Sequence, residues 1–391
     1  MFEAFKTFET TLAGRPFAVE VGKMAGLANG ACLVRYGETA VLCTATMADR
    51  PREGIDFFPL SVDFEEKLYA VGKIPGSFLK REGRPSEKAV LASRVIDRPM
   101  RPLFPKDMRN DVCIVCTVMS VDPDNSPEIA AMNGASIAVA ISDIPWNGPI
   151  AGMSVGLVDG KVVMNPTAEQ REKSDLALTV ASTHNKVAMI EAGANEVSDD
   201  VMYDAIMMAH EENVAMVSFI NNMVKEIGKP KKDFPSQALD PDFLAAVEDF
   251  ATDKVRWALF DADKTVRDKR MAEVTEQTKE HFAQIDETKL PLIDEALYQT
   301  QKHVVRRALL DEGKRVDGRG LYDLRPLNAE VGLLPRVHGS GMFTRGQTQV
   351  LTIATLGTMR ESQLLDGIDS EEYKRYMHHY NFPSYSVGEA R

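Results

Sequence analysis

Gly37-Glu-Thr-Ala-Val-Leu-Cys-Thr-Ala-Thr46 occurs twice in this chain, the second time as Gly346-Gln-Thr-Gln-Val-Leu-Thr-Ile-Ala-Thr355. Each copy follows a segment that begins Glu-Val-Gly, at Glu20 and at Glu330. A glycine turn followed by a strand rich in Val, Thr and Leu is typical of a β-hairpin with at least one buried face. Because the match extends through the preceding Glu-Val-Gly, we expect an internal duplication.

Strand-like and helix-like segments alternate through the first copy. The apolar run Val112–Met119 predicts a buried strand. The sequence Ser126-Pro-Glu128 predicts the start of a helix, with an acidic residue at the positive end of the helix dipole. Asp159-Gly160 lies between two apolar runs and predicts a hairpin turn. The sequence therefore predicts a mixed α/β (α+β) domain over residues 1–228.

The composition changes after this domain. No glycine occurs from Lys229 to Glu312, although the chain holds 26. Asp240-Pro241 is typical of a helix start, and apolar residues follow at helical spacing. We predict an all-helical domain over residues 241–311, which serves as a connector or docking face.

The second copy begins near Arg315 and reaches the last residue, Arg391. The first copy continues for about 190 residues beyond its turn glycine, the second for only about 45. A sheet interrupted at this point would leave open edges. We therefore expect the chain to be a fragment that stops inside a partial second domain, residues 315–391.

Bulk properties restrict the function classes. The 391 residues carry a net charge of −12, which argues against binding nucleic acid over the whole surface. Four cysteines in a chain of this length are no disulfide framework, so we expect a reducing cytoplasm. No run approaches the ~18 apolar residues that a membrane span needs, so no membrane association is expected.

A local basic region stands against this acidic background. From Lys73 to Arg109 there are ten Lys and Arg residues and four Asp and Glu residues. Within it, a glycine- and proline-rich loop carries Phe78, Lys80, Arg81 and Arg84. Cations beside an aromatic ring suit single-stranded RNA, through phosphate attraction and base stacking. The same features fit a solvated surface loop anchored by Phe78, and charge and spacing favour neither interpretation.

A helix is expected to open at Ser86 and to end near Arg98, before Pro99. Arg94 and Arg98 then lie one turn apart, with Arg101 just beyond. These arginines could face RNA, or they could pair with Asp97 and neighbouring carboxylates. The structural interpretation is slightly favoured.

Other motifs indicate no catalytic or metal site. Cys113 and Cys116 have CxxC spacing, but they lie in an apolar strand without a second ligand pair, which favours a buried core role over zinc. His378 and His379 are adjacent, so on a strand they point to opposite faces. We therefore assign no catalytic residue and no metal ligand in this chain.

Several motifs together resemble the polynucleotide phosphorylase family over essentially the whole chain. They are Gly37–Thr46, Ile74–Glu87, Ile96–Phe104, Arg315–Arg319 and His378–Glu389. The resemblance implies two ribonuclease PH-like domains, the second present in part, around a helical RNA-binding or linker domain. It also implies a polyribonucleotide nucleotidyltransferase: a 3′-to-5′ phosphorolytic exoribonuclease that releases nucleoside diphosphates from single-stranded RNA in mRNA degradation.

The resemblance further implies inorganic phosphate as co-substrate, Mg²⁺ as cofactor, a homotrimeric ring and partners in an RNA-degradation complex. Phe78, Lys80 and Arg81 match the loop that grips RNA in the ring's channel. The family's usual Phe-Phe-Arg-Arg reads Phe-Leu-Lys-Arg here, so this chain has one stacking ring fewer and Lys80 lacks the planar fork of arginine. The family's phosphate-binding loop and metal-binding aspartates would lie beyond Arg391, so we expect this chain alone to be inactive. A non-catalytic RNA-binding or ring-scaffold subunit is the alternative.

Overall fold

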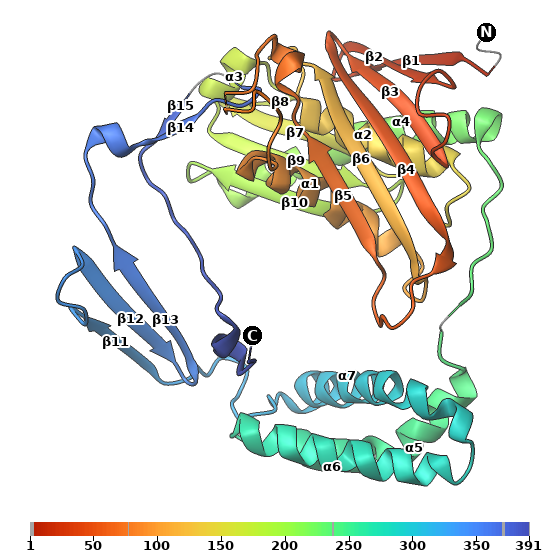
Figure 1. Cartoon of the computed structure of the whole chain (residues 1–391), viewed down its shortest axis with the longest axis vertical. Helices are drawn as coiled ribbons and strands as arrows, with labels where there is room; N and C mark the ends of the chain where they lie inside the picture. The colour runs from red at the N-terminus through yellow and green to blue at the C-terminus, as the bar shows by residue number, and fades with distance from the viewer. Residues whose placement is uncertain (1–3, 77, 237, 370–371, 391) are drawn as a thin grey trace. The chain divides into compact units, whose positions relative to one another are not determined.

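The computed structural model of the chain describes residues 4–76, 78–236, 238–369 and 372–390. It divides into two compact units, Met1–Gln237 with Gln363–Arg391, and Ala238–Ser362. In the first unit two β-sheets enclose a buried helix; the second unit holds three long helices and a three-stranded sheet (Figure 1). Among the described residues, none of the helices combines the length and the apolar character that crossing a bilayer requires.

The larger sheet of the first unit has the strand order β1-β2-β3-β4-β6-β5. Only β5 and β6 pair in parallel; the other neighbours are antiparallel. The strand predicted at 112–119 is confirmed as β6, in which buried and half-buried side chains alternate up to Val118. The strands are β1 (Lys6–Leu12), β2 (Arg15–Val21), β3 (Gly30–Tyr36), β4 (Thr39–Pro51), β5 (Leu60–Glu65) and β6 (Asn110–Ser120).

The second sheet has the order β10-β9-β7-β8. The predicted hairpin at Asp159-Gly160 is confirmed, because both residues have positive φ (50° and 73°) as a two-residue type I′ turn requires. The strands are β7 (Ala151–Val158), β8 (Lys161–Met164), β9 (Leu176–Ser182) and β10 (Val187–Ala194), with the short α3 (Ala168–Glu172) after β8.

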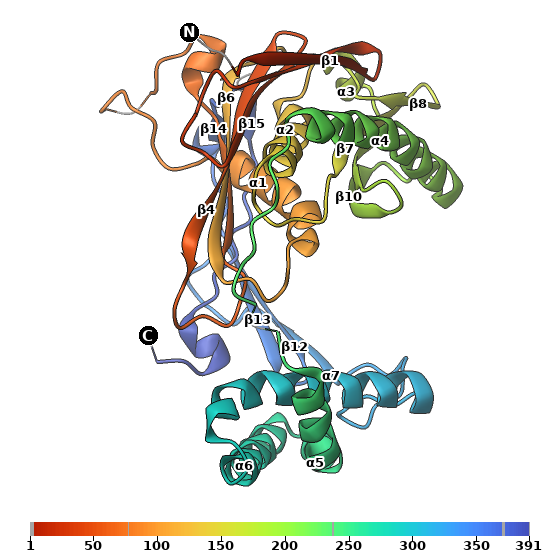
Figure 2. The same cartoon turned by 90° about the vertical axis from the view of Figure 1, so that its right-hand side faces the viewer.

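Helix α2 (Pro127–Ile141) packs against β3 and β4 on one side and against β7 and α4 (Asp199–Ile227) on another (Figure 2). Its predicted start is confirmed, since the Ser126 side chain accepts a hydrogen bond from the Ile129 amide. Every residue of α2 except Glu128 is buried. A Cβ on Gly134 would lie 2.5 Å from Cys43 Sγ, so the helix approaches the sheet more closely than any side chain there allows.

Helix α1 (Glu87–Met100) differs slightly from the prediction. The sequence predicts an end near Arg98, yet Pro99 lies inside the last turn of the helix. Only one residue of the helix follows this proline, so no long helical segment has to continue beyond it. Short 3₁₀ segments flank the helix, η1 (Leu68–Val71) before it and η2 (Arg101–Leu103) after it.

The second unit contains the glycine-free part of the chain as helices with a core of their own. The helices are α5 (Pro241–Leu259), α6 (Lys264–Ala283), η3 (Glu287–Leu292) and α7 (Ile293–Glu312). Phe243, Val247, Val274 and Phe282 belong to this core. The side chain of Asp240 caps α5, as predicted. The domain boundaries at 228, 241, 311 and 315 stay a prediction.

The second copy of the repeat folds as the first does. Strands β11 (Leu327–Val331), β12 (Gly339–Arg345) and β13 (Thr348–Ala354) form an antiparallel sheet in chain order. Gly37 and Gly346 begin equivalent turns, with φ of 56° and 62°. Burial differs, because every residue of β4 up to Ala45 is buried or half-buried, whereas all seven residues of β13 are exposed.

The last described residues belong to the first unit. They form β14 (Gln363–Leu365), β15 (Glu372–Lys374) and η5 (Ser384–Val387), after η4 (Met359–Glu361). Among the residues described after Glu312, only Ile368 is buried, at 3% exposure, and it joins the main core of the first unit.

Candidate RNA-binding site

The predicted RNA-binding residues all lie on the loop that joins β5 to α1. This loop, residues 66–86, contains η1 and is called here the basic loop. Phe78 is 97% exposed and Leu79 is 77% exposed. Lys80, Arg81 and Arg84 are exposed as well. The loop thus presents one fully exposed aromatic ring and three cationic side chains to the surroundings.

Local backbone geometry sets the shape of this loop. Lys80 has φ of 48°, in the left-handed region that non-glycine residues rarely adopt. Gly72 closes η1 with φ of 69°. Lys80 is therefore held in a sparsely populated conformation, of the kind found at ligand-binding sites.

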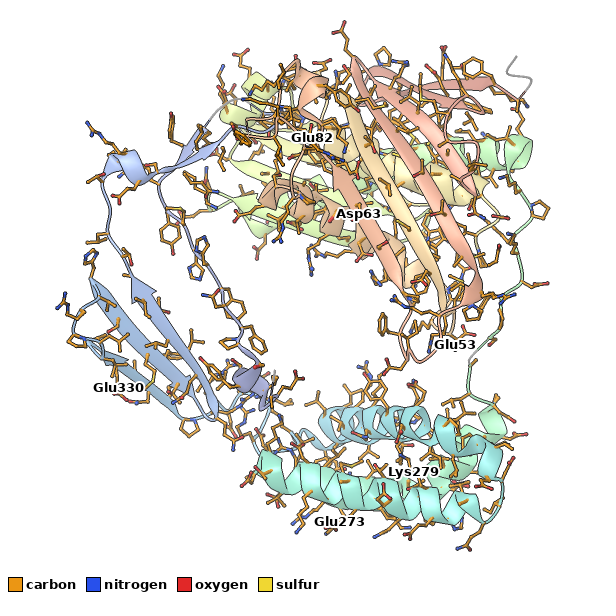
Figure 3. All side chains as sticks on the ribbon, in the orientation of Figure 1. Glu53, Asp63, Glu82, Glu273, Lys279 and Glu330 are labelled. Atoms are coloured by element: carbon orange, nitrogen blue, oxygen red, sulfur yellow. The ribbon has the colours of Figure 1, made fainter. Side chains whose placement is uncertain are left out.

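Hydrogen bonds close the basic loop at its base. The Leu68 amide donates to Glu82 Oε1 over 3.0 Å; Glu82 and the β5 residue Asp63 are labelled in Figure 3. Ser86 Oγ donates to Glu66 Oε2 over 2.6 Å. The same Ser86 oxygen accepts the Ala89 amide and so caps α1. The two ends of the loop are thereby tied to each other and to the start of the helix.

A charged cluster lies beside this base, and the sequence does not indicate it. Lys88 Nζ lies 3.1 Å from Glu128 Oε1 and also pairs with Asp369, which is 281 positions away in the chain. Together with Glu66, these residues form what we call the Lys88 cluster. Sequence patterns single out only Glu128, as a helix-dipole residue. A pairing between exposed charges this far apart has no local sequence signal.

Burial and neighbouring charges shift the pKa values of the carboxyl groups in this cluster. Burial raises the pKa of Glu66, and the nearby carboxylates of Asp369 and Glu128 add to this against the opposing effects of Ser86 and Lys88. Burial alone would also raise the pKa of Glu128, but the Lys88 ammonium and the Ser126 hydroxyl outweigh it and hold that pKa below its usual value. Lys88 therefore offsets part of the negative charge of the three carboxylates.

The arginines at the end of α1 are engaged in ion pairs. Arg101 lies 2.8 Å from Asp97, and Arg98 lies 2.5 Å from Glu191 on β10. Arg101 also donates to the carbonyl of Leu60 over 3.0 Å. The structural interpretation is thus confirmed for Arg98 and Arg101. Arg94 is exposed.

The cysteines and histidines do not combine into a site. Cys116 is buried in the core, while Cys113 is half-buried on the opposite face of β6. His378 contacts the Tyr376 hydroxyl at 3.1 Å, and His379 is exposed. The sequence does not predict which cysteines become neighbours in the sheet. Across β3, β4 and β6, Cys32, Cys43 and Cys116 lie directly opposite one another. Only strand register reveals it.

The described residues do not fit a magnesium site. None of their His, Cys, Asp and Glu side chains form a group of three or more placed to hold a metal ion. In the Lys88 cluster, where three carboxylates gather, the Lys88 ammonium already takes the position between Glu128 and Asp369. Around the basic loop, the described side chains include the exposed cations Lys80, Arg81 and Arg84 and the exposed ring of Phe78.

Comparisons with known proteins agree with this arrangement. The profile of the 3′ exoribonuclease family, domain 1, matches residues 13–145 and 323–391, and that of domain 2 matches residues 148–212. One profile thus matches both copies of the repeat, which confirms the duplication. A profile described as the RNA binding domain of polyribonucleotide nucleotidyltransferase matches residues 242–320.

Curated relatives match almost the whole chain. A polyribonucleotide nucleotidyltransferase of Ruminiclostridium cellulolyticum is 60% identical over 387 residues, 99% of this chain and 55% of the relative. That of Lachnoclostridium phytofermentans is 57% identical, over 99% of this chain and 56% of the relative. The chain thus spans about 55% of the length of the first of these relatives.

A solved structure, rice Rrp46, is 13% identical with a TM-score of 0.46, and the match covers 55% of this chain and 96% of that one. Together, the matched family profiles cover more than half of the chain. The chain belongs to the 3′ exoribonuclease family and is similar to the polyribonucleotide nucleotidyltransferases within it.

Proposed function

We propose that this chain is the RNA-binding part of a longer enzyme, a 3′-to-5′ phosphorolytic exoribonuclease. That enzyme would act on single-stranded RNA in mRNA degradation. The observation that carries the proposal is the basic loop, where exposed Phe78 stands beside Lys80, Arg81 and Arg84 in a chain of net charge −12. The 60% identity to a polyribonucleotide nucleotidyltransferase supports it.

The loop's side chains have complementary roles in this proposal. Lys80, Arg81 and Arg84 attract RNA phosphates without regard to sequence. Phe78 offers a face on which any base can stack. Such a site holds a flexible single strand, whose bases are accessible, better than a duplex, whose bases are already stacked.

Catalysis in the whole enzyme would be nucleotidyl transfer: inorganic phosphate attacks the last phosphodiester phosphorus, the 3′ oxygen of the shortened RNA leaves, and the terminal nucleotide is released as a nucleoside diphosphate. Bound magnesium supplies charge neutralisation in such reactions. We propose that the groups for phosphate and metal lie outside this chain, in the remaining length that the relatives possess. A homotrimer, a cytoplasmic location and partners in an RNA-degradation complex belong to the same proposal.

The test is binding and turnover by the purified chain. Fluorescence anisotropy should show that a labelled single-stranded RNA 20-mer binds more tightly than the same sequence as a duplex. With phosphate and Mg²⁺ added, the RNA should remain intact and no nucleoside diphosphate should appear. Equal affinity for both forms would contradict the assigned RNA-binding role, and phosphate-dependent release of diphosphates would contradict the assignment of catalysis to residues outside the chain.

A further inference from the structure

The base of the basic loop contacts a segment of the second copy of the repeat. Residues 363–369, which we call the docked segment, follow the exposed sheet of β11–β13 in sequence but belong to the first compact unit. Ile368 is 3% exposed within the main core of this unit. A buried apolar side chain of this kind anchors the segment, because moving it back into water is unfavourable.

Polar contacts from the docked segment converge on both ends of the basic loop. Near its start, Lys73 Nζ donates to the Gly367 carbonyl over 3.5 Å. Beyond its end, Asp369 pairs with Lys88 in the first turn of α1. Beyond the docked segment, Lys374 of β15 also pairs with Glu87 over 3.4 Å. The segment therefore contacts the loop and the helix that follows it.

Asp369 pairs with a lysine that also pairs with a residue of the buried core helix. Lys88 is shared between Asp369 and Glu128, and Glu128 belongs to the buried helix α2. The pKa of Glu66 is shifted by the same charges. Glu66 accepts a hydrogen bond from Ser86, whose oxygen also caps α1. Ion pairs thus join the docked segment and the core helix through Lys88 at the start of α1. The hydrogen bond from Ser86 to Glu66 at the base of the loop lies close enough for these charges to shift the pKa of Glu66.

We infer that the docked segment positions the basic loop, with Asp369 and Lys88 as positioning residues for RNA binding. The inference rests on the proposed RNA-binding role of the loop. The side chains of Phe78, Lys80 and Arg84 at the tip are exposed. The loop is joined to itself and to the start of α1 at its base, through hydrogen bonds at Leu68, Glu66 and Ser86, so the base sets where the tip lies. In this way, the docked segment from the second copy of the repeat would tune the RNA affinity of the basic loop in the first copy.

The test uses Asp369→Asn, which removes the charge that pairs with Lys88, and Ile368→Ala, which weakens the anchor. Both variants should speed amide hydrogen exchange in residues 66–86. Asp369→Asn should weaken RNA binding about twofold to fivefold, as expected for one partly exposed ion pair. The slope of affinity against salt should stay unchanged, because every cation that faces RNA phosphate is retained. Glu372→Gln, an exposed residue after the docked segment, is the matched control and should change neither quantity.

Two outcomes distinguish this inference from the proposed function. If Lys80→Ala with Arg81→Ala weakens RNA binding but Asp369→Asn and Ile368→Ala leave both exchange and affinity as in the wild type, the docked segment has no positioning role and the inference is wrong. If Asp369→Asn speeds exchange in the loop while the double variant leaves RNA binding unchanged, the docking is real, but the RNA-binding role fails and the positioning claim fails with it. Lys88→Arg, which keeps the ion pairs, should retain wild-type affinity.

Discussion

At the scale of single residues, the tip of the basic loop differs from its family pattern at two positions. Where the family usually has Phe-Phe-Arg-Arg, this chain has Phe78, Leu79, Lys80 and Arg81. Leu79 is 77% exposed, so a larger ring fits there without disturbing the core. An aliphatic side chain cannot stack on a base as an aromatic ring does. Changing residue 79 to an aromatic therefore tests directly whether base stacking at this position adds to RNA affinity.

We expect opposite effects from two changes at neighbouring positions. Phe78→Ala should weaken binding of single-stranded RNA by about 1–3 kcal/mol, and Leu79→Phe should strengthen it within the same range, because stacking on one aromatic ring is worth that much. Neither change alters charge, so the salt dependence should be preserved. Anisotropy titrations at fixed salt measure both, with Leu79→Met as the size-matched control. A Leu79→Phe variant no tighter than that control would show that no base reaches position 79.

At the scale of secondary-structure elements, the two copies of the repeat have the same hairpins but different burial. Val41, Cys43 and Ala45 of β4 are fully buried against α2. In β13 the equivalent residues Val350, Thr352 and Ala354 are all exposed. Strands β12 and β13 therefore pair with less apolar burial than the burial that stabilises β3 and β4.

Hydrogen exchange should separate the two copies. Amides of 340–356 should exchange through local opening and much faster than amides of 37–46, which we expect to open only with the whole core. The measurement is exchange followed by peptide mass spectrometry, with β6 as an internal reference for the core. Equal protection in the two hairpins would mean that β13 has packing partners that its exposure does not reveal.

At the scale of the whole molecule, local patterns predict local structure well. The repeat, the Asp159-Gly160 turn and the helix starts at Ser126 and Asp240 are predictable because hairpins and caps depend on residues a few positions apart. The prediction that Pro99 would stop α1 is wrong by two residues, since a proline near a helix end disturbs few hydrogen bonds.

The functional site is predictable only in part. The basic loop can be recognised as a local excess of positive charge, and its resemblance to a family loop is the ground for the proposed RNA-binding role. The Lys88 cluster cannot be predicted from the sequence, because its four residues come together only in the tertiary fold: Glu66, Lys88, Glu128 and Asp369. The row of Cys32, Cys43 and Cys116 likewise depends on strand register, which the sequence does not specify residue by residue.

The central claim is that the basic loop of this chain binds single-stranded RNA through its cations. The most direct test is RNA affinity as a function of salt for the wild type and for Lys80→Ala with Arg81→Ala. Lys161→Ala with Lys186→Ala removes two exposed charges far from the loop in sequence and is the matched control. The loop variant should bind all sequences more weakly, and its log–log salt slope should flatten by about 0.7 for each RNA phosphate that the protein no longer neutralises. Affinity and slope equal to those of the control would contradict the claim and leave the loop as a solvated surface turn.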